Sequence, residues 1–153
     1  LRPNEDRLVM SAELEIDNAG DVVAQSFTRG IIRSAARMTY TAVHRILEGD
    51  EAERQVYAHL VPHFEHMREL ALILNRKRTR RGSIDFDLPE SLIEFDENGL
   101  MTGVARAPRN ISHRIIEEFM LSANEAVAAH IAHAAVPSLY RIHEIPDVKK
   151  VHD

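Results

Sequence analysis

The chain has 153 residues, 44% of them hydrophobic, and its formal net charge is −5 at pH 7. Material of this amount fits one domain that buries roughly two thirds of its unfolded surface. The acidic balance argues against a protein whose whole surface attracts nucleic acid, although a local basic stripe would still bind phosphates. The lack of cysteine excludes disulfides and thiolate metal sites and fits a reducing compartment. With no apolar run near the length of a membrane helix, we expect a cytoplasmic protein with no membrane partner.

The first segment predicts a β-hairpin. Apolar residues alternate with polar ones over 8–16, which is the period of a half-buried strand. Residues 17–21 have the composition of a turn, and 22–29 read as the second strand.

A long helical region follows. Residues 39–47 predict a short helix ended by Gly49, and Asp50 is suited to cap a longer stretch that runs to about Arg80. Pro62 predicts a kink in that stretch or its division into two helices. Its apolar residues recur at spacings of three and four: Val56, Leu60, Phe64, Met67, Ala71 and Leu74.

Short strands and a second helix complete the chain. Asn110 or Ser112 is expected to cap a helix to about residue 133, and a last strand is expected over 139–143, after Pro137. Helices and strands in blocks favour an α+β fold, with an antiparallel or mixed sheet, over a doubly wound sheet. Three strands, with turns between them, are expected before the second helix: 83–87, 91–95 and 100–107.

The second helix carries a candidate binding pair. Glu117 and Asn124 are seven residues apart at the edge of the apolar stripe, where a carboxylate and an amide can hydrogen-bond to a hydroxyl-bearing ligand. Alternatively, both merely satisfy neighbouring backbone or an arginine. Glu118 and Glu125 are expected to be solvated. The apolar face is expected to combine Ile115, Ile116, Phe119, Met120, Ala123, Val127 and Ile131.

Residues 85–87 allow three interpretations. Alternation in a strand puts Asp85 and Asp87 on one face, where they are a weak match to a divalent-cation site. Phe86, on the other face, is suited to stack on a base, or simply to fill the core.

Two further groups of residues have competing explanations. The basic run 76–81 either meets the negative pole of a helix end or lines a path for a phosphate backbone. Histidines 59, 63 and 66 have spacings that zinc could use, but Pro62 disturbs their geometry, so we interpret them as surface residues. His130 and His133 receive the same interpretation.

Three sequence runs in this order resemble a known family. They are Arg80-Arg81-Gly82-Ser83-Ile84-Asp85-Phe86-Asp87 and Ile116-Glu117-Glu118-Phe119-Met120-Leu121-Ser122-Ala123-Asn124, followed by Leu139-Tyr140-Arg141-Ile142-His143. Together they are similar to the middle of the catalytic RNB domain of the ribonuclease II/ribonuclease R exoribonucleases. The resemblance spans nearly the whole chain. It implies hydrolysis of RNA from the 3′ end to nucleoside monophosphates, with magnesium held by clustered aspartates.

The resemblance also implies roles for single residues. Phe86 matches an aromatic that packs on terminal bases, and Glu117 matches a glutamate that is expected to contact the terminal nucleotide through the ribose hydroxyl. Tyr40 is expected in the core. The residues that we expect to bind single-stranded RNA are Phe86, Glu117, Asn124, Arg80, Arg81 and Arg114.

The same resemblance makes the chain look like one partial domain, 1–153, of a longer enzyme. It places the family's metal-binding aspartates before Leu1 and its arginine-rich catalytic segment after Asp153. We therefore expect no catalytic or metal-ligating residue here, Mg²⁺ only in the longer protein, and an inactive fragment. The rival hypothesis is a non-catalytic module that binds RNA or protein. Exposed sheet edges would also permit self-association.

Overall fold

The computed structural model describes residues 2–84, 91–106 and 109–141. Four strands and four helices in this part confirm the α+β class, and the strands form two separate two-stranded antiparallel sheets. In chain order the elements are β1 (Asp6–Ile16), β2 (Val22–Arg33), α1 (Tyr40–Glu48), α2 (Glu51–Val56), α3 (Val61–Arg80), β3 (Ser91–Phe95), β4 (Met101–Arg106) and α4 (Ile111–His133).

The predicted first hairpin is confirmed. β1 and β2 pair from Asp6↔Arg33 towards a turn that the Asp17 carboxylate closes by accepting hydrogen bonds from the N–H groups of Ala19 and Asp21. The alternation predicted a half-buried first strand, but Leu8 and Met10 are 87% and 82% exposed. Because the sheet has only two strands, nothing in the described part of the chain covers this end of that face.

Local signals divide the helical region as expected. The Thr39 hydroxyl accepts from the N–H of Ala42 to begin α1, and Gly49 ends it in the left-handed conformation. The Asp50 carboxylate caps α2 by accepting from the N–H of Glu53. Pro62 lies in the first turn of α3, where its missing N–H needs no partner, so the stretch is two helices.

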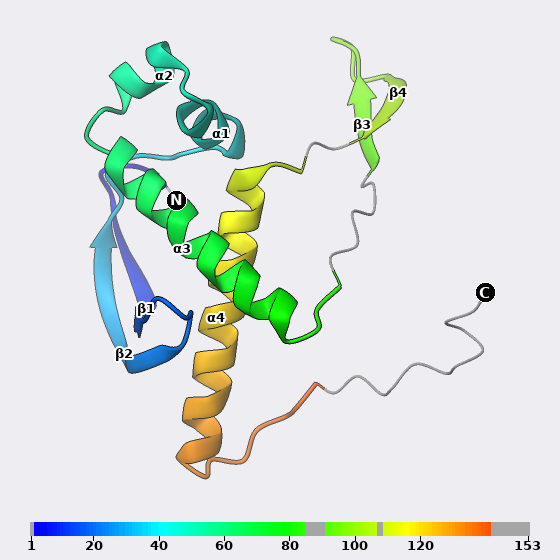
Figure 1. Cartoon of the computed structure of the whole chain (residues 1–153). Coiled ribbons are helices and arrows are strands. Elements are labelled where there is room, and N and C mark those ends of the chain that lie inside the picture. Colours follow the sequence, from blue (N-terminus) through cyan, green and yellow to red (C-terminus); the bar gives the residue numbers. More distant parts are fainter. Residues whose placement is uncertain (1, 85–90, 107–108, 142–153) are drawn as a thin grey trace, which may run out of the picture.

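The later elements follow the predictions less closely. Asn110 caps α4, accepting from the N–H of Ser112, and β3 pairs with β4 in a hairpin that stands apart from the helices (Figure 1). The predicted strand 83–87 lies mostly outside the described residues, and its first two are not in a strand. The predicted strand 139–143 is wrong for 139–141, which form no ladder; its last two residues lie outside the described part.

The core lies where α1, α3 and α4 meet (Figure 1). The predicted stripe of α3 is buried at Phe64, Ala71 and Leu74, whereas Val56 is exposed because it belongs to α2. Tyr40 is not a core residue: it is 47% exposed and stacks on the His113 ring, with centroids 4.1 Å apart. None of the described helices is long and apolar enough to span a membrane.

The buried face of α4 differs from the predicted one. Ile115 is buried, but Ile116, Met120 and Val127 are exposed to solvent. The buried residues of this helix are Ser112, Ile115, Glu118 and Ala126. Helix α4 packs against both α1 and α3, and the Ser112 hydroxyl donates to the Tyr40 carbonyl of α1, so the packing partners, rather than the greatest density of apolar residues, set the buried side of the helix.

Candidate functional site

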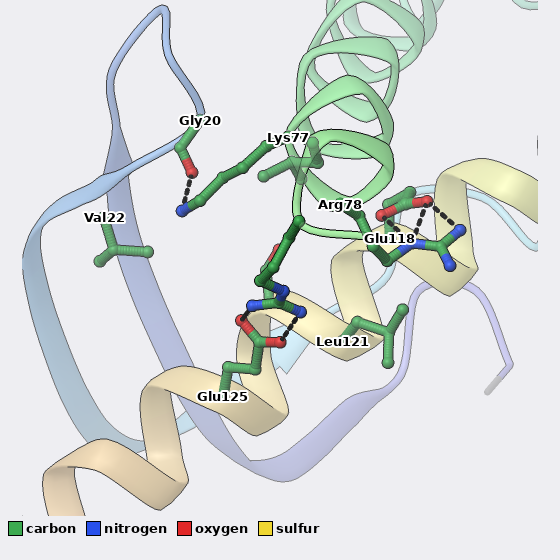
Figure 2. A pocket seen from close by; sticks show the side chains of 10 residues that line it. Gly20, Val22, Lys77, Arg78, Glu118, Leu121 and Glu125 are labelled. Atoms are coloured by element: carbon green, nitrogen blue, oxygen red, sulfur yellow. Dashed lines mark hydrogen bonds and ion pairs between the residues drawn. The ribbon is translucent and has the colours of Figure 1, made fainter. Parts of the chain in front are cut away.

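A buried carboxylate joins the two long helices. Glu118 of α4 has a side chain that is only 4% exposed, and the facing side chain of Arg78 on α3 is 20% exposed. Arg78 donates from Nη2 to Oε1 at 2.8 Å, and from Nε to Oε1 and Oε2 at 3.1 and 3.3 Å (Figure 2). Asn75, one turn earlier on α3, donates from Nδ2 to Oε1 at 2.9 Å. The carboxylate is thus held by one edge of a guanidinium and by an amide.

The expectation that Glu118 is solvated is therefore wrong. The surface of α3 that α4 meets is apolar at Ala71 and Leu74 but continues one turn later into Arg78. An arginine in a helix contact needs a carboxylate to offset the loss of its hydration. Glu118 supplies that carboxylate from the middle of α4.

Glu117, the residue before Glu118, lines a separate cavity. A cavity of about 300 Å³ is lined by Arg78, Arg109, Glu117, Met120, Leu121 and Asn124. Arg109 donates from Nη2 to Oε2 of Glu117 at 2.9 Å, and Glu117 remains about half exposed. The structure thus places Glu117 and Asn124 in the lining of one cavity, and it also gives Glu117 the arginine partner that the alternative anticipated.

The cavity has the chemistry of a site for a polar, charged ligand. Glu117 offers carboxylate acceptors, Asn124 offers both an acceptor and donors, and two arginines bring positive charge. Met120 and Leu121 add an apolar wall. Its volume lies at the lower end of the range of small-molecule sites, which is about 300–1,000 Å³. A sugar hydroxyl and an adjoining phosphate would both find partners there.

Lys77, Arg78 and Arg81 of the basic run line a second, smaller pocket between α3, α4 and the tip of the first hairpin (Figure 2). Lys77 donates from Nζ to the Gly20 carbonyl and pairs with the Asp21 carboxylate, both at 2.8 Å. Arg81 pairs with Glu125 at 2.7 Å. This side-chain hydrogen bond lowers the pKa of the Glu125 carboxyl, against the opposing effect of burial, and it raises the pKa of Arg81.

The other predicted residues are not gathered at the cavity. Arg80 donates to the Ala19 carbonyl at 3.3 Å and so helps to hold the hairpin tip, whereas Arg81 is paired with Glu125 of α4. Neither of these arginines, nor Arg114, lines the cavity that contains Glu117. Phe86 lies outside the described residues, so its predicted stacking role stays a prediction.

Asp85 and Asp87 also lie outside the described residues. Within 2–84, 91–106 and 109–141, no three His, Cys, Asp or Glu side chains converge as metal ligands would. The exposed histidines His59, His63 and His66, all described, form no such group. The described residues therefore offer no candidate magnesium site.

Sequence reasoning missed the residues that complete the site. The sequence indicates Arg78 only as one member of a basic run, and it does not single out Arg109. A signal for Arg78 was present, because the apolar stripe of α3 continues to it at a spacing of four from Leu74. No comparable signal marked Arg109, whose contact with Glu117 depends on how the chain enters α4.

Comparisons with known proteins agree with this architecture. The family model of the RNB domain matches residues 1–153. Ribonuclease R of Aquifex aeolicus is 46% identical over 99% of this chain, and that of Escherichia coli is 35% identical over 99%. The chain spans only 21% and 19% of their lengths.

Solved structures give the same result for the fold. The apo form of Mycoplasma genitalium RNase R superposes with a TM-score of 0.88 at 26% identity, covering 99% of this chain and 23% of that one. The same RNase R in complex with ribose-methylated single-stranded RNA also has a TM-score of 0.88, at 25% identity and with the same coverage. The match of the RNB model to every residue shows that this chain belongs to the RNB-domain family.

Proposed function

We propose that this chain is part of an exoribonuclease that hydrolyses RNA processively from the 3′ end and releases nucleoside monophosphates. The observation that carries the proposal is the match of the RNB-domain model to residues 1–153. Relatives named ribonuclease R, at up to 46% identity among those compared, support it. In this proposal the chain is one partial domain of a longer cytoplasmic enzyme.

Within that enzyme, the cavity around Glu117 contacts the RNA strand. Glu117 accepts a hydrogen bond from a ribose hydroxyl, and Asn124 adds donors and an acceptor beside it. Arg109, 2.9 Å from Glu117, fixes that carboxylate and brings positive charge to the same wall. The 2′-hydroxyl is the group that distinguishes RNA from DNA, so this contact would select RNA. Solved Mycoplasma genitalium RNase R complexes with single- and double-stranded RNA support RNA as the ligand.

Hydrolysis itself would depend on groups outside the described residues. The Mg²⁺ that activates water in such reactions needs clustered carboxylates, and the described part of the chain offers no such cluster. We therefore expect the isolated chain to bind RNA weakly and not to degrade it. Magnesium-dependent degradation of single-stranded RNA by the pure chain would overturn this expectation.

The binding role is tested by fluorescence anisotropy with a labelled single-stranded RNA and with a DNA of the same sequence, at low salt. The wild-type chain should prefer RNA, and Glu117→Gln and Glu117→Ala should weaken RNA binding and reduce that preference. Glu125→Gln, a change of the same kind on the same helix but outside the cavity, is the matched control. Phe86→Ala tests the stacking role separately, with an expected loss of about 1–3 kcal/mol per base. Absence of RNA binding, or equal binding by the Glu117 variants, would contradict the proposed contact.

A further inference from the structure

Arg78 belongs to two environments at once. Its Nε and Nη2 atoms hold the buried carboxylate of Glu118, and the same side chain lines the cavity that contains Glu117 and Asn124. Neighbouring residues on a helix point about 100° apart. Glu118 and Glu117 are such neighbours on α4, so the Glu118 carboxylate faces α3 and holds Arg78 while the Glu117 carboxylate meets the cavity.

The way in which Arg78 is held restricts its orientation. A guanidinium is planar and rigid, so hydrogen bonds at 2.8 and 3.1 Å along one edge set the direction of the whole group. Asn75 donates to the same carboxylate oxygen at 2.9 Å and restricts Glu118 in turn. Both helices therefore contribute to the placement of one cation.

Stability alone does not account for this arrangement. Replacing a buried ion pair by apolar residues of similar size is often neutral or stabilising, because the charges lose their hydration. The adjoining helix contact is made by Ala71 and Leu74, so an apolar continuation would suit the packing. An oriented cation beside a carboxylate-lined cavity instead suits recognition of a phosphodiester, which carries the negative charge that Glu117 and Asn124 do not bind.

We propose that Glu118 and Asn75 are positioning residues that fix the Arg78 guanidinium in the cavity wall, where Arg78 contacts a phosphate of the bound RNA strand. The inference rests on the proposed function, because it places the phosphate beside the ribose that Glu117 contacts. It adds a residue for the backbone to the residues proposed for the sugar.

The test is the salt dependence of RNA binding, measured by anisotropy with the same labelled single strand. Each phosphate contact contributes about 0.7 to the slope of log K against log salt concentration for a single strand. Arg78→Gln should weaken binding about tenfold at low salt, as expected for a lost charge-assisted hydrogen bond, and should reduce the slope by about 0.7. If Arg78 only stabilised the fold, Arg78→Gln would lower the fraction of protein able to bind RNA without changing the slope of log K against log salt concentration.

Glu118→Gln separates positioning from general charge. The substitution keeps the shape of the side chain and removes a negative charge, so a general electrostatic effect would tighten RNA binding. Positioning predicts the opposite: weaker binding, a smaller slope, and no further loss in the Arg78→Gln/Glu118→Gln double variant. Glu125→Gln, which frees an exposed arginine partner on the same two helices, is the matched control and should not weaken binding.

Asn75→Ala provides a second test of positioning in case Glu118→Gln does not fold, because it removes one hydrogen bond and no charge. It should weaken binding in the same direction, and circular dichroism should show each variant folded. Tighter binding by Glu118→Gln, or an unchanged slope for Arg78→Gln, overturns this inference while leaving the Glu117 contact standing. If the Glu117 variants bind RNA as tightly as wild type while Arg78→Gln has a reduced salt slope, the ribose contact is overturned and the phosphate contact is supported.

Discussion

Removal of the Arg78 guanidinium should destabilise the fold strongly. In Arg78→Met the apolar stem is retained, but of its hydrogen bonds with the described residues the Glu118 carboxylate, 4% exposed, keeps only the one from Asn75. Breaking one side of a buried ion pair typically costs 3–5 kcal/mol, because the remaining charge stays buried. Arg78 is itself 20% exposed, so water can partly replace it. We therefore expect a loss near the lower limit, about 3 kcal/mol.

Arg81→Met is the matched control. It makes the same substitution three residues later on the chain and breaks the pair with Glu125, whose two side chains are 60% and 57% exposed. Exposed pairs contribute about 1 kcal/mol at most. In urea unfolding followed by circular dichroism, with a slope of about 2 kcal/mol per molar, the midpoint should fall by about 1.5 M for Arg78→Met and by less than about 0.5 M for Arg81→Met.

A second variant shows whether the loss comes from the unpaired charge. Adding Glu118→Leu to Arg78→Met removes the buried carboxylate and should recover most of the lost stability. Equal midpoints for Arg78→Met and Arg81→Met, or no recovery in the double variant, would refute the reasoning that the buried pair joins α3 and α4.

Three further predictions concern other parts of the molecule. Gly20→Ala should lower the melting temperature more than Gly99→Ala. Both glycines have positive φ, but only at Gly20 would the added Cβ meet Lys77 and Ile73 atoms at 3.2–3.4 Å; equal losses would contradict this. Because the folded-state pKa of Glu125 is lowered, its stabilisation is present above the ordinary glutamate pKa and is lost as pH falls through the lowered value. The melting temperature should therefore fall more on acidification for wild type than for Arg81→Gln. Equal falls in the two proteins would exclude the effect. Met10→Lys, on the exposed strand face, should reduce any self-association seen by sedimentation, and an unchanged mass would place the contact elsewhere.

The sequence alone determined the local structure, because local signals act over a few residues. The Asp17 turn closes the first hairpin, and Thr39, Asp50 and Asn110 cap helices, where short polar side chains reach nearby N–H groups. Pro62 divides the helical region for the same kind of reason. The pair Glu117 and Asn124 also followed from helix periodicity, which is a property of one segment.

Only the tertiary structure decided which polar groups are buried and what they contact. The helix pattern predicts a solvated Glu118, whereas in the structure α3 places Arg78 and Asn75 against its carboxylate. The sequence predicts Tyr40 in the core, whereas in the structure its ring stacks on His113 of α4 at the surface. The segment 139–141 has strand-like residues but no neighbouring strand to pair with in the described part of the chain. Burial and pairing are relations between segments far apart in sequence, and periodicity within one segment does not contain them.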